Sequence, residues 1–339
     1  MASRIAINGF GRIGRAAFKI AHERSDIEIV AINDLTDTET LAHLLRHDSV
    51  YGTYAHEVSH TEKGIVVDGN EYPVLAIKDP STLPWKEYKI DVVLECTGRF
   101  RTKETAGMHI QAGAKKVVLS APAKGGDVAT VVLGVNHDTL SDALKAGDVI
   151  SNASCTTNCI APAAKVMHQS FKVQKALMTT IHSYTADQNL VDGPHKDLRR
   201  ARAAAHNIVP TTTGAAISTT ETIPDLKGKF DGMAVRVPTI VGSLSDFTFV
   251  LDQEVTVEQV NKAFEEAAKK TEYTGILEVT HEPIVSSDII GNTHSSIVDL
   301  SLTKVVDGNL VKIVSWYDNE WGYSNRLIDL LAAVCKKLS

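Results

Sequence analysis

The first 34 residues limit the fold more than any other part of the chain. A strand-like stretch, residues 4–8, is followed at once by three glycines in G-x-G-x-x-G spacing, Gly9, Gly11 and Gly14. An apolar stripe with helical period comes next, and a second strand-like stretch ends at Asp34. Strand, glycine turn, helix and a distant acid together predict a dinucleotide-binding unit, with the pyrophosphate at the helix N-terminus and Asp34 on the ribose hydroxyls. The alternative is a tight turn that binds nothing.

Further apolar strands indicate the sheet to which this unit belongs. Residues 91–98, 115–122 and 129–136 are short Val- and Leu-rich runs, and some of them are separated by stretches suited to helices. Continuous apolar strands that alternate with helices predict a parallel sheet buried on both faces. Ser120 falls at a strand end, where such sheets bind ligands, while Cys96 lies inside an apolar strand and is expected in the core.

The stretch "ISNASCTTNCIAP", residues 150–162, follows the last strand of this half. It is typical of a turn into a helix, with Ser154 or Asn152 as the cap. Cys155 would then lie in the first helical turn, where backbone amides and the helix dipole lower the pKa of a thiol. Cys159, one turn later on the same face, should be buried and inert. Position alone leaves two possibilities for Cys155, a reactive thiol or a packed side chain.

The four cysteines do not suggest a disulfide framework or a metal site. They are few for 339 residues, and cytosolic thiols stay reduced. A zinc site needs four ligands in close pairs, whereas Cys155 and Cys159 are spaced C-x-x-x-C and Cys96 and Cys335 stand alone. We therefore expect no metal.

Charge and hydropathy narrow the class of protein. A net charge of −6 offers no general attraction to nucleic acid or to an anionic membrane. The N-terminus has no apolar signal core, and no apolar run is long enough to span a membrane. We expect a cytoplasmic protein, without nucleic acid binding as its primary function, whose 339 residues suit two domains.

From about residue 177 the pattern changes to longer, alternating strands with fewer helices between them. Residues 233–252 suggest a long pair of strands or one bent strand. A capping box, Thr256 to Gln259, opens an amphipathic helix, and Asp307-Gly308 is a hairpin signal. These features predict an α+β domain with a mixed sheet and helices on one face, followed by a C-terminal helix that returns to the first domain.

Several residues of this half could take part in chemistry. His182 lies near a strand end, although a hydrogen-bonded structural histidine is equally compatible with that place. Groups suited to phosphate are Arg199, Arg200, Thr213, Gly214 and Arg236. For Arg199 and Arg200 the alternative is a solvated helix face. Arg236 interrupts an apolar strand, so its charge needs a partner.

Six segments together resemble the phosphorylating glyceraldehyde-3-phosphate dehydrogenases, in order and nearly without gaps. They are "INGFGRIGR", "SNASCTTNC", "TTIHSYTADQ", "DLRRARAAAHNIVPTTTGAA", "VRVPT" and "SWYDNEWGYSNR". The resemblance implies an α/β chain with a Rossmann-type parallel-sheet domain, residues 1–153, and an α+β catalytic domain with a mixed sheet, residues 154–319. The helix at about 320–339 would pack back on the first domain.

The resemblance also implies a role for particular residues. Cys155 would be the nucleophile that attacks the aldehyde, and His182 would activate it and act as acid and base. The phosphates of the substrate and of inorganic phosphate would be held by Ser154, Thr156, Thr185, Arg200, Thr213, Gly214 and Arg236. NAD would be held by the three glycines Gly9, Gly11 and Gly14 together with Arg12, Ile13, Asp34, Lys78, Ser120, Asn319 and Tyr323.

The implied reaction oxidises glyceraldehyde 3-phosphate to an acyl phosphate with NAD and inorganic phosphate, in glycolysis, by a homotetramer. Alternatives are an erythrose-4-phosphate dehydrogenase, a non-catalytic dinucleotide-binding protein, and a cysteine hydrolase, which would leave the coenzyme motif unexplained. Lys78, Ala186 and Gly193 depart from the commonest family pattern and bear on coenzyme contacts rather than on catalysis.

Overall fold

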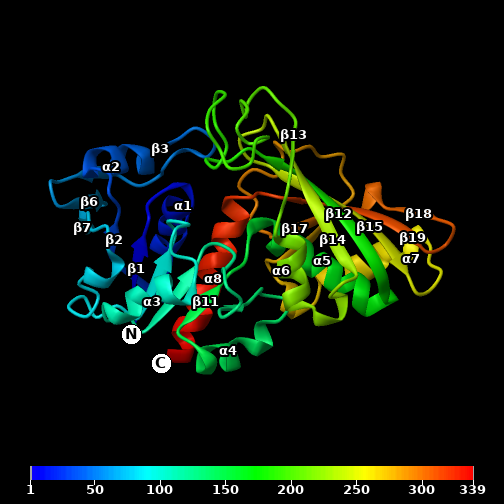
Figure 1. Ribbon diagram of the computed structural model, residues 1–339, viewed down its shortest axis with the longest axis horizontal. Coiled ribbons are helices and arrows are strands. Elements are labelled where there is room, and N and C mark those ends of the chain that lie inside the picture. Colours follow the sequence, from blue (N-terminus) through cyan, green and yellow to red (C-terminus); the bar gives the residue numbers. More distant parts are fainter. Residues whose placement is uncertain (1, 339) are drawn as a thin grey trace. The chain divides into compact units, whose positions relative to one another are not determined.

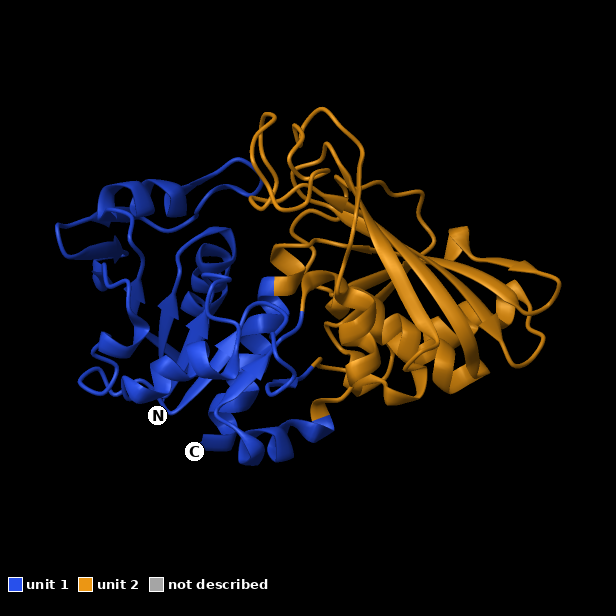
Figure 2. Ribbon diagram, viewed as in Figure 1, with its two compact units in different colours: residues 1–131, 138–153, 324–339 blue, residues 132–137, 154–323 orange. Residues whose placement is uncertain are grey.

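A computed structural model describes residues 2–338 of the chain. Contacts divide the chain into two compact units (Figure 2). The first comprises residues 1–131, 138–153 and 324–339, and the second comprises residues 132–137 and 154–323. Each unit contains its own large sheet, and no helix within residues 2–338 has the length and apolar character needed to cross a membrane.

The first unit is built on a nine-stranded sheet in the order β10-β11-β9-β8-β1-β2-β7-β6-β5. Figure 1 labels β1, β2, β6, β7 and β11 of this sheet. All neighbours are parallel except at one edge, where β5, β6 and β7 pair antiparallel. The parallel sheet predicted from the apolar runs is therefore confirmed. The antiparallel edge was not predicted from the sequence. The strands are β1 (Ser3–Asn8), β2 (Ile27–Asn33), β5 (Val58–His60), β6 (Gly64–Val67), β7 (Asn70–Leu75), β8 (Val92–Glu95), β9 (Lys116–Leu119), β10 (Ala129–Thr130) and β11 (Val149–Ser151).

Helices α1 (Arg12–His22), α2 (Thr38–Arg46), α3 (Lys103–Gln111) and α4 (Leu140–Ala146) belong to this unit, as does the short pair β3 (His47–Asp48) and β4 (Gly52–Thr53). Helix α8 (Trp321–Leu338) begins in the second unit and continues in the first. The core on one side of the sheet includes Trp85, Val93 and Val117, all fully buried. Helices cover both faces of a parallel sheet of this kind. Its central strands can therefore carry apolar residues on both faces.

The second unit has an eight-stranded mixed sheet, ordered β13-β14-β12-β15-β19-β17-β16, with β18 beside β19. Residues 233–252 contribute to two strands, as predicted for a long pair, rather than to one bent strand, but the two strands are not neighbours in the sheet. Strand β12 lies between them, parallel to β14 and antiparallel to β15. The strands are β12 (Val173–Ser183), β13 (Val209–Thr211), β14 (Phe230–Val237), β15 (Ser243–Leu251), β16 (Leu277–Thr280), β17 (Ser296–Asp299), β18 (Lys304–Val306) and β19 (Leu310–Tyr317).

Helices α5 (Cys155–Phe171), α6 (Ala215–Thr222) and α7 (Val257–Ala268) form one layer on this sheet, because α5 contacts both other helices as well as β12, β15 and β19. The predicted capping box opens α7, with Thr256 and Gln259 satisfying each other's backbone amides. Asp307 and Gly308 have positive φ angles of 47° and 74° and join β18 to β19, which confirms the hairpin.

Candidate active site

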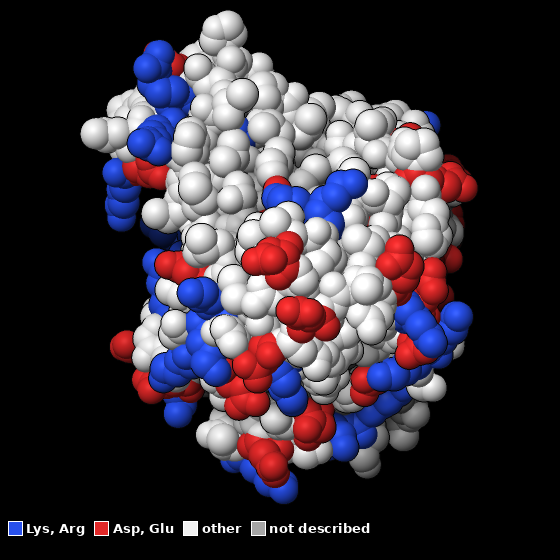
Figure 3. All heavy atoms as spheres, turned by 90° about the vertical axis from the view of Figure 1, so that its right-hand side faces the viewer, with Lys and Arg blue, Asp and Glu red and all other residues white. Residues whose placement is uncertain are grey.

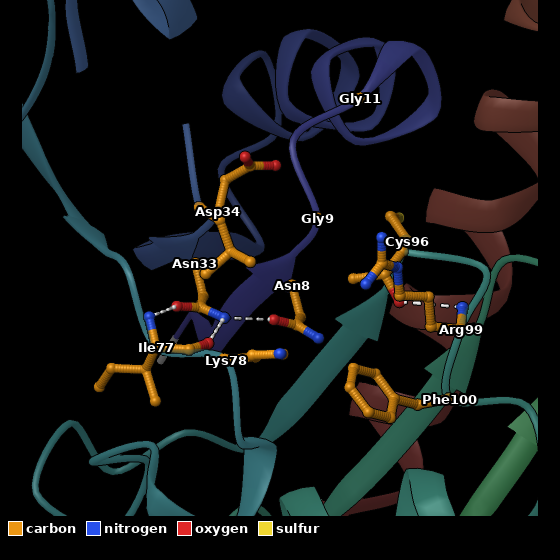
Figure 4. A pocket seen from close by; sticks show the side chains of 12 residues that line it. Asn8, Gly9, Gly11, Asn33, Asp34, Ile77, Lys78, Cys96, Arg99 and Phe100 are labelled. Carbon is orange, nitrogen blue, oxygen red and sulfur yellow. Dashed lines mark hydrogen bonds between the residues drawn. The ribbon is translucent and has the colours of Figure 1, made fainter. Parts of the chain in front are cut away.

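The first unit contains a cavity of about 540 Å³ at the carboxyl ends of its central strands (Figure 4). Asn8 ends β1, Asn33 ends β2, and Cys96 and Thr97 directly follow β8. The chain leaves β1 toward β2 and later returns on the other side as β8, so the cavity lies where the strand order reverses. Parallel sheets bind ligands at this position. The lining comprises Asn8, Gly9, Gly11, Asn33, Asp34, Leu35, Ile77, Lys78, Cys96, Thr97, Arg99 and Phe100.

The glycine turn has the shape that a pyrophosphate requires. Gly9 has a φ of +93°, and a Cβ there would lie 2.7 Å from the amide nitrogen of Thr97. A Cβ on Gly14 would lie 2.1 Å from the carbonyl oxygen of Gly9, so helix α1 can approach β1 only with glycine there. Gly11 precedes α1 and has no atom within 4 Å of its Cβ position, which leaves its backbone open to a ligand.

Asp34 is held in place by the turn that it serves. Its carboxylate accepts hydrogen bonds from the backbone amides of Phe10, at 2.7 Å, and Thr36, at 3.0 Å. Each carboxylate oxygen keeps a further lone pair for a ribose hydroxyl. Figure 4 shows the carboxylate beside the chain that leads from Gly9 to Gly11. The donors, acceptors and open backbone of this cavity therefore fit a dinucleotide.

A buried polar network supports the cavity, and the sequence interpretation missed it. The side-chain amide of Asn33 donates to Asn8, at 2.7 Å, and to the carbonyl oxygen of Ile77, at 2.9 Å. Asn8 in turn donates to Glu95 at 2.5 Å. On the far side of Glu95, His109 Nε2 lies 3.1 Å from the same carboxylate, and Nδ1 of His109 accepts the indole N–H of Trp85 at 3.0 Å. Separations of 14 to 87 residues along the chain hide these pairs in the sequence.

Of four other residues expected at the coenzyme, one lines the cavity and three do not. Lys78 lines the cavity, whereas Arg12 and Ile13, in the first turn of α1, do not. The guanidinium of Arg12 instead contacts both carboxylate oxygens of Asp48, at 3.2 and 3.3 Å. Ser120 directly follows β9 and does not line the cavity.

The position of Cys96 differs from the one predicted from the sequence. It was expected inside a core strand, but it follows the end of β8, is half-buried and lines the cavity. Burial of its sulfur raises the pKa of this thiol to about 12, so it stays protonated.

Cys155 is the first residue of α5 in the second unit. Ser154 caps the helix, because its hydroxyl accepts the backbone amide of Thr157 at 3.0 Å; of the two expected caps, Ser154 is thus the one used. Ala153 just before it has a φ of 57°, a conformation that is uncommon for residues other than glycine. This turn leaves Cys155 half-buried rather than packed away.

The thiol of Cys155 and the imidazole of His182 meet. The distance from Sγ to Nε2 is 3.5 Å, and Nδ1 of His182 lies 2.6 Å from the carbonyl oxygen of Ser183. A carbonyl only accepts, so Nδ1 carries the ring proton, and Nε2 presents its lone pair to the thiol. Position in the sequence could not show this meeting, since the two residues are 27 apart.

The protonation states differ from the expectation for Cys155. Burial raises the pKa of its thiol, against the opposing effects of the Arg236 charge and of hydrogen bonds from Thr156. The predicted lowering by the helix terminus is therefore wrong for this structure, because removal from water disfavours the thiolate more than these groups stabilise it. Burial, and then the Arg236 charge, lower the pKa of His182 to about 3. The pair consequently rests as a neutral thiol and a neutral imidazole.

Cys159 is the buried neighbour that its position predicted. Its side chain is 0% exposed, and its sulfur lies 3.5 Å from Oγ of Ser315. Burial raises the pKa of this thiol to about 12, so it is an unreactive cysteine one helical turn from Cys155.

Arg236 lies beside His182, because β14 and β12 run parallel with these two residues in register. Its Nη1 donates to the carbonyl oxygen of Ser183 at 3.1 Å and to the hydroxyl of Thr185 at 3.3 Å. Its Nε is buried and has no hydrogen-bond partner within the described chain. A buried donor without an acceptor suits an anionic ligand.

The remaining phosphate candidates are more fully engaged in protein contacts. Arg200 donates to the hydroxyl of Thr211, to the carbonyl oxygen of Thr212 and to Asp187. The hydroxyl of Thr213 accepts the amide of Ala215 at 3.2 Å, and Gly214 precedes α6.

Two further residues expected to hold NAD belong to the second unit. The side-chain oxygen of Asn319 accepts the Gly242 amide at 3.1 Å and the Ser243 hydroxyl at 2.9 Å. Tyr323, in the first turns of α8, is buried.

Tyr317 is a site residue that the sequence did not single out. Its hydroxyl lies 2.9 Å from Oγ1 of Thr156 and 2.8 Å from Oγ1 of Thr180, and its ring meets that of His182 edge to face at 5.9 Å. These contacts hold the Thr156 hydroxyl and the face of the imidazole in place. A tyrosine that ends an apolar strand carries no signal of this role in the sequence.

Comparison with known proteins identifies the family. A family model described as the NAD binding domain of glyceraldehyde 3-phosphate dehydrogenase matches residues 3–103, and the corresponding C-terminal domain matches residues 154–319. Glyceraldehyde-3-phosphate dehydrogenase of Geobacillus stearothermophilus is 55% identical over 337 residues, covering 99% of both chains. That of Streptomyces coelicolor is 55% identical over 339 residues, covering 100% of both, and that of Thermotoga maritima is 55% identical over 336 residues, covering 98% of this chain and 99% of its own. A chain with this cysteine–histidine pair and full-length relatives of this similarity belongs to the glyceraldehyde-3-phosphate dehydrogenase family.

Proposed function

We propose that this chain oxidises glyceraldehyde 3-phosphate with NAD and inorganic phosphate, using Cys155 as the nucleophile and His182 as its base. The family supports the oxidation and the coenzyme. The observation that supports the residue roles is the 3.5 Å contact between the Cys155 sulfur and the unprotonated Nε2 of His182.

The neutral pair is suited to a thiol that ionises only as it attacks. Nε2 of His182 takes the proton of Cys155, and Sγ adds to the aldehyde carbon to form a hemithioacetal. The backbone amide of Cys155, at the start of α5, is a donor for the resulting oxyanion. NAD, when bound, supplies the acceptor for the hydride. The acyl group then stays on Sγ as a thioester, which conserves the energy of the oxidation.

The acyl group must next leave Cys155. An oxygen of inorganic phosphate attacks the thioester carbon, the C–S bond breaks, and an acyl phosphate departs while sulfur regains a proton. Support for phosphate, rather than water, comes from the guanidinium of Arg236, whose buried Nε has no acceptor within the described chain and whose Nη1 contacts the Thr185 hydroxyl. An anion bound there is positioned for attack instead of having to diffuse in.

A rapid-mix assay of NADH absorbance tests this reaction. Without phosphate, we expect a burst of about one NADH per chain and then near arrest at the thioester. Added phosphate or arsenate should restart turnover. Steady turnover without phosphate, with free carboxylic acid as product, would make water the acceptor and contradict the role of Arg236. Higher kcat/KM with erythrose 4-phosphate than with the triose would contradict the substrate.

The chain is also proposed to assemble as a homotetramer. Apolar side chains on the second unit support an interface, since Leu177, on β12, is 66% exposed and Ile217, on α6, is 65% exposed. They line one cavity with Phe230, Val250 and Leu310. On the face seen in Figure 3, acidic and basic side chains are interspersed around largely uncharged areas. Light scattering after gel filtration gives the mass, and a monomer at micromolar concentration would contradict the assembly.

A further inference from the structure

Two histidines and a glutamate of the first unit gather at the end of α1 that is remote from the glycine turn. His22 is the last residue of α1, Glu23 caps it, and His56 comes from the loop before β5. One ligand atom from each lies within 4.8 Å of the other two. Within residues 2–338 this is the one group of three or more His, Cys, Asp or Glu side chains with that geometry.

The individual distances bracket those of a metal site. Nε2 of His56 lies 2.6 Å from Oε1 of Glu23, and Nδ1 of His22 lies 4.0 Å from the same oxygen. Zinc–ligand bonds of about 2.0–2.2 Å place neighbouring ligands of a tetrahedral ion roughly 3.3–3.5 Å apart. Small side-chain rotations would therefore bring the three atoms around one ion.

The outer partner of His56 is the kind that metal-binding histidines have. Nδ1 of His56 donates to Oδ2 of Asp68 at 2.5 Å, and the other oxygen of Asp68 accepts the Glu57 amide at 3.0 Å. This pairing places a proton on Nδ1 of His56, so Nε2, 2.6 Å from Oε1 of Glu23, is the nitrogen that could bind a cation in place of a second proton. A carboxylate that holds the second nitrogen of a ligating histidine orients the ring and raises its basicity.

His22 is held by its own neighbours. Its ring stacks on Phe18, with centroids 5.8 Å apart and an interplanar angle of 19°, and its Nδ1 lies 3.5 Å from the hydroxyl of Tyr54. The ring is thus positioned by packing, with Nδ1 on the side of Glu23. A ligand fixed in this way loses little conformational entropy on binding a metal.

The charges suit a dication. With both imidazoles neutral, the carboxylates of Glu23 and Asp68 give the cluster two negative charges, and the carbonyl end of α1 adds a favourable dipole. The exposed fraction of the side chain is 14% for His22, 26% for His56 and 62% for Glu23. A bound ion would therefore be reachable from solvent and could keep a water as its fourth ligand.

We propose that His22, Glu23 and His56 bind a zinc-class divalent cation, with Asp68 as the positioning residue for His56. Two imidazoles and one carboxylate favour zinc, copper or nickel over magnesium or calcium, which prefer oxygen. The competing description is a proton in place of the metal, which makes His56 a bridge between two carboxylates. Helix α1 has 11 residues, so the cluster lies about 15 Å along the helix from its glycine end.

Calorimetric titration of the full chain with zinc chloride tests the proposal. A Cys155→Ser background removes the thiol that would itself bind zinc, and chelation before dialysis removes bound metal. We expect one zinc per chain, binding at least tenfold weaker after His22→Asn or His56→Asn, and an unchanged affinity after His60→Asn. His60 is the control because it is exposed, lies on β5 four residues after His56 and does not belong to the cluster.

Asp68→Asn gives the sharpest test. Asp68 has a φ of 49°, which asparagine also adopts readily, so the backbone should be unaffected. We expect a 10- to 100-fold loss of zinc affinity. Cobalt should give a visible d–d absorption band in the background protein that His56→Asn removes. If the histidine variants unfold, Glu23→Gln, at an exposed side chain, still reports on the site. Absence of zinc binding in the Cys155→Ser protein would overturn the proposal, as would His22→Asn and His56→Asn variants that bind zinc as tightly as that protein does.

Discussion

His182 and Arg236 share one acceptor, the backbone carbonyl oxygen of Ser183. Nδ1 of His182 donates to it at 2.6 Å and Nη1 of Arg236 at 3.1 Å, from adjacent parallel strands. The carbonyl therefore fixes the tautomer of the imidazole and anchors the guanidinium together. The same cation lowers the pKa of His182, after the larger effect of burial, and favours the thiolate of Cys155.

Arg236→Met should therefore slow alkylation of Cys155. Loss of the cation raises the pKa of a thiol that burial has already raised, and each pKa unit costs about tenfold in thiolate at neutral pH. We expect iodoacetamide labelling at pH 7 to fall about 3- to 30-fold. Arg199→Met, at an exposed side chain of the same unit, is the control. Equal labelling rates in both variants would rule out the electrostatic role.

The low pKa of His182 predicts acid sensitivity. Its folded value of about 3 lies below the value of 6.5 for the unfolded chain, so the unfolded state binds the extra proton. Above pH 6.5 His182 is neutral in both states, so its pKa shift does not reduce the free energy of unfolding. As the pH falls from 6.5 toward 3, protonation of His182 in the unfolded chain lowers that free energy by up to about 1.4 kcal/mol per pH unit. Urea unfolding between pH 4 and 7 should show a steeper loss for the wild-type chain than for His182→Asn. Parallel pH dependences would contradict a neutral buried imidazole.

The two cysteines of α5 should respond oppositely to substitution. Cys155→Ser should lower NADH formation by at least about 10³-fold, since a serine is a far weaker nucleophile there, while NAD affinity stays the same. Cys159→Ser should retain activity within about threefold, because its sulfur is buried against Ser315. Peptide mapping after brief iodoacetamide treatment should find Cys155 modified first. Earlier labelling of Cys96 or Cys335 would contradict the assignment of the nucleophile.

Asp34 should select NAD over NADP. Its carboxylate is fixed by the amides of Phe10 and Thr36, so it cannot turn away from a 2′-phosphate. Repulsion in a half-buried site costs about 1–3 kcal/mol, or roughly 10- to 100-fold in affinity. Asp34→Asn keeps one side-chain acceptor for these amides and removes the charge. It should therefore lower the ratio of kcat/KM with NAD to kcat/KM with NADP. Similar efficiencies with both coenzymes in the wild-type chain would refute this.

Glu95 should matter for both stability and coenzyme binding. It is 2% exposed and joins Asn8, Thr97 and His109 beneath the cavity. Glu95→Ala leaves these groups unpaired, so we expect a loss of about 3–5 kcal/mol in the free energy of unfolding. NAD affinity should fall even at temperatures where the variant remains folded, as circular dichroism can check. Glu104→Ala, on α3, is the control. An unchanged NAD affinity would show that the Glu95 network does not support coenzyme binding in the cavity.

Local features of the fold were readable from the sequence. The glycine turn, the helix that starts at Cys155, the capping box at Thr256 and the hairpin at Asp307 each depend on a few neighbouring residues. Their physical causes, such as a positive φ or an unsatisfied amide, act within one turn of chain. Strand order could not be read in this way, because β12 separates β14 from β15 through long-range pairing.

The candidate site was only partly readable for the same reason. Cys155 and His182 are recognisable by motif, but the tautomer of His182 depends on a carbonyl whose position is set by folding. The pKa of Cys155 was misjudged because burial of its sulfur cannot be inferred from a helix terminus. Tyr317 and the Glu95 network went unseen because their partners lie far away along the chain.

Trp85, whose buried indole donates a hydrogen bond to His109, also gives the chain an intrinsic fluorescent label. Of its three tryptophans, Trp85 alone lies in the first unit, fully buried, while Trp316 and Trp321 belong to the second. Blue-shifted fluorescence that disappears with Trp85→Phe would thus report on the first unit alone. Melting of the two units could then be followed separately in one sample, without attaching a dye to any of the thiols.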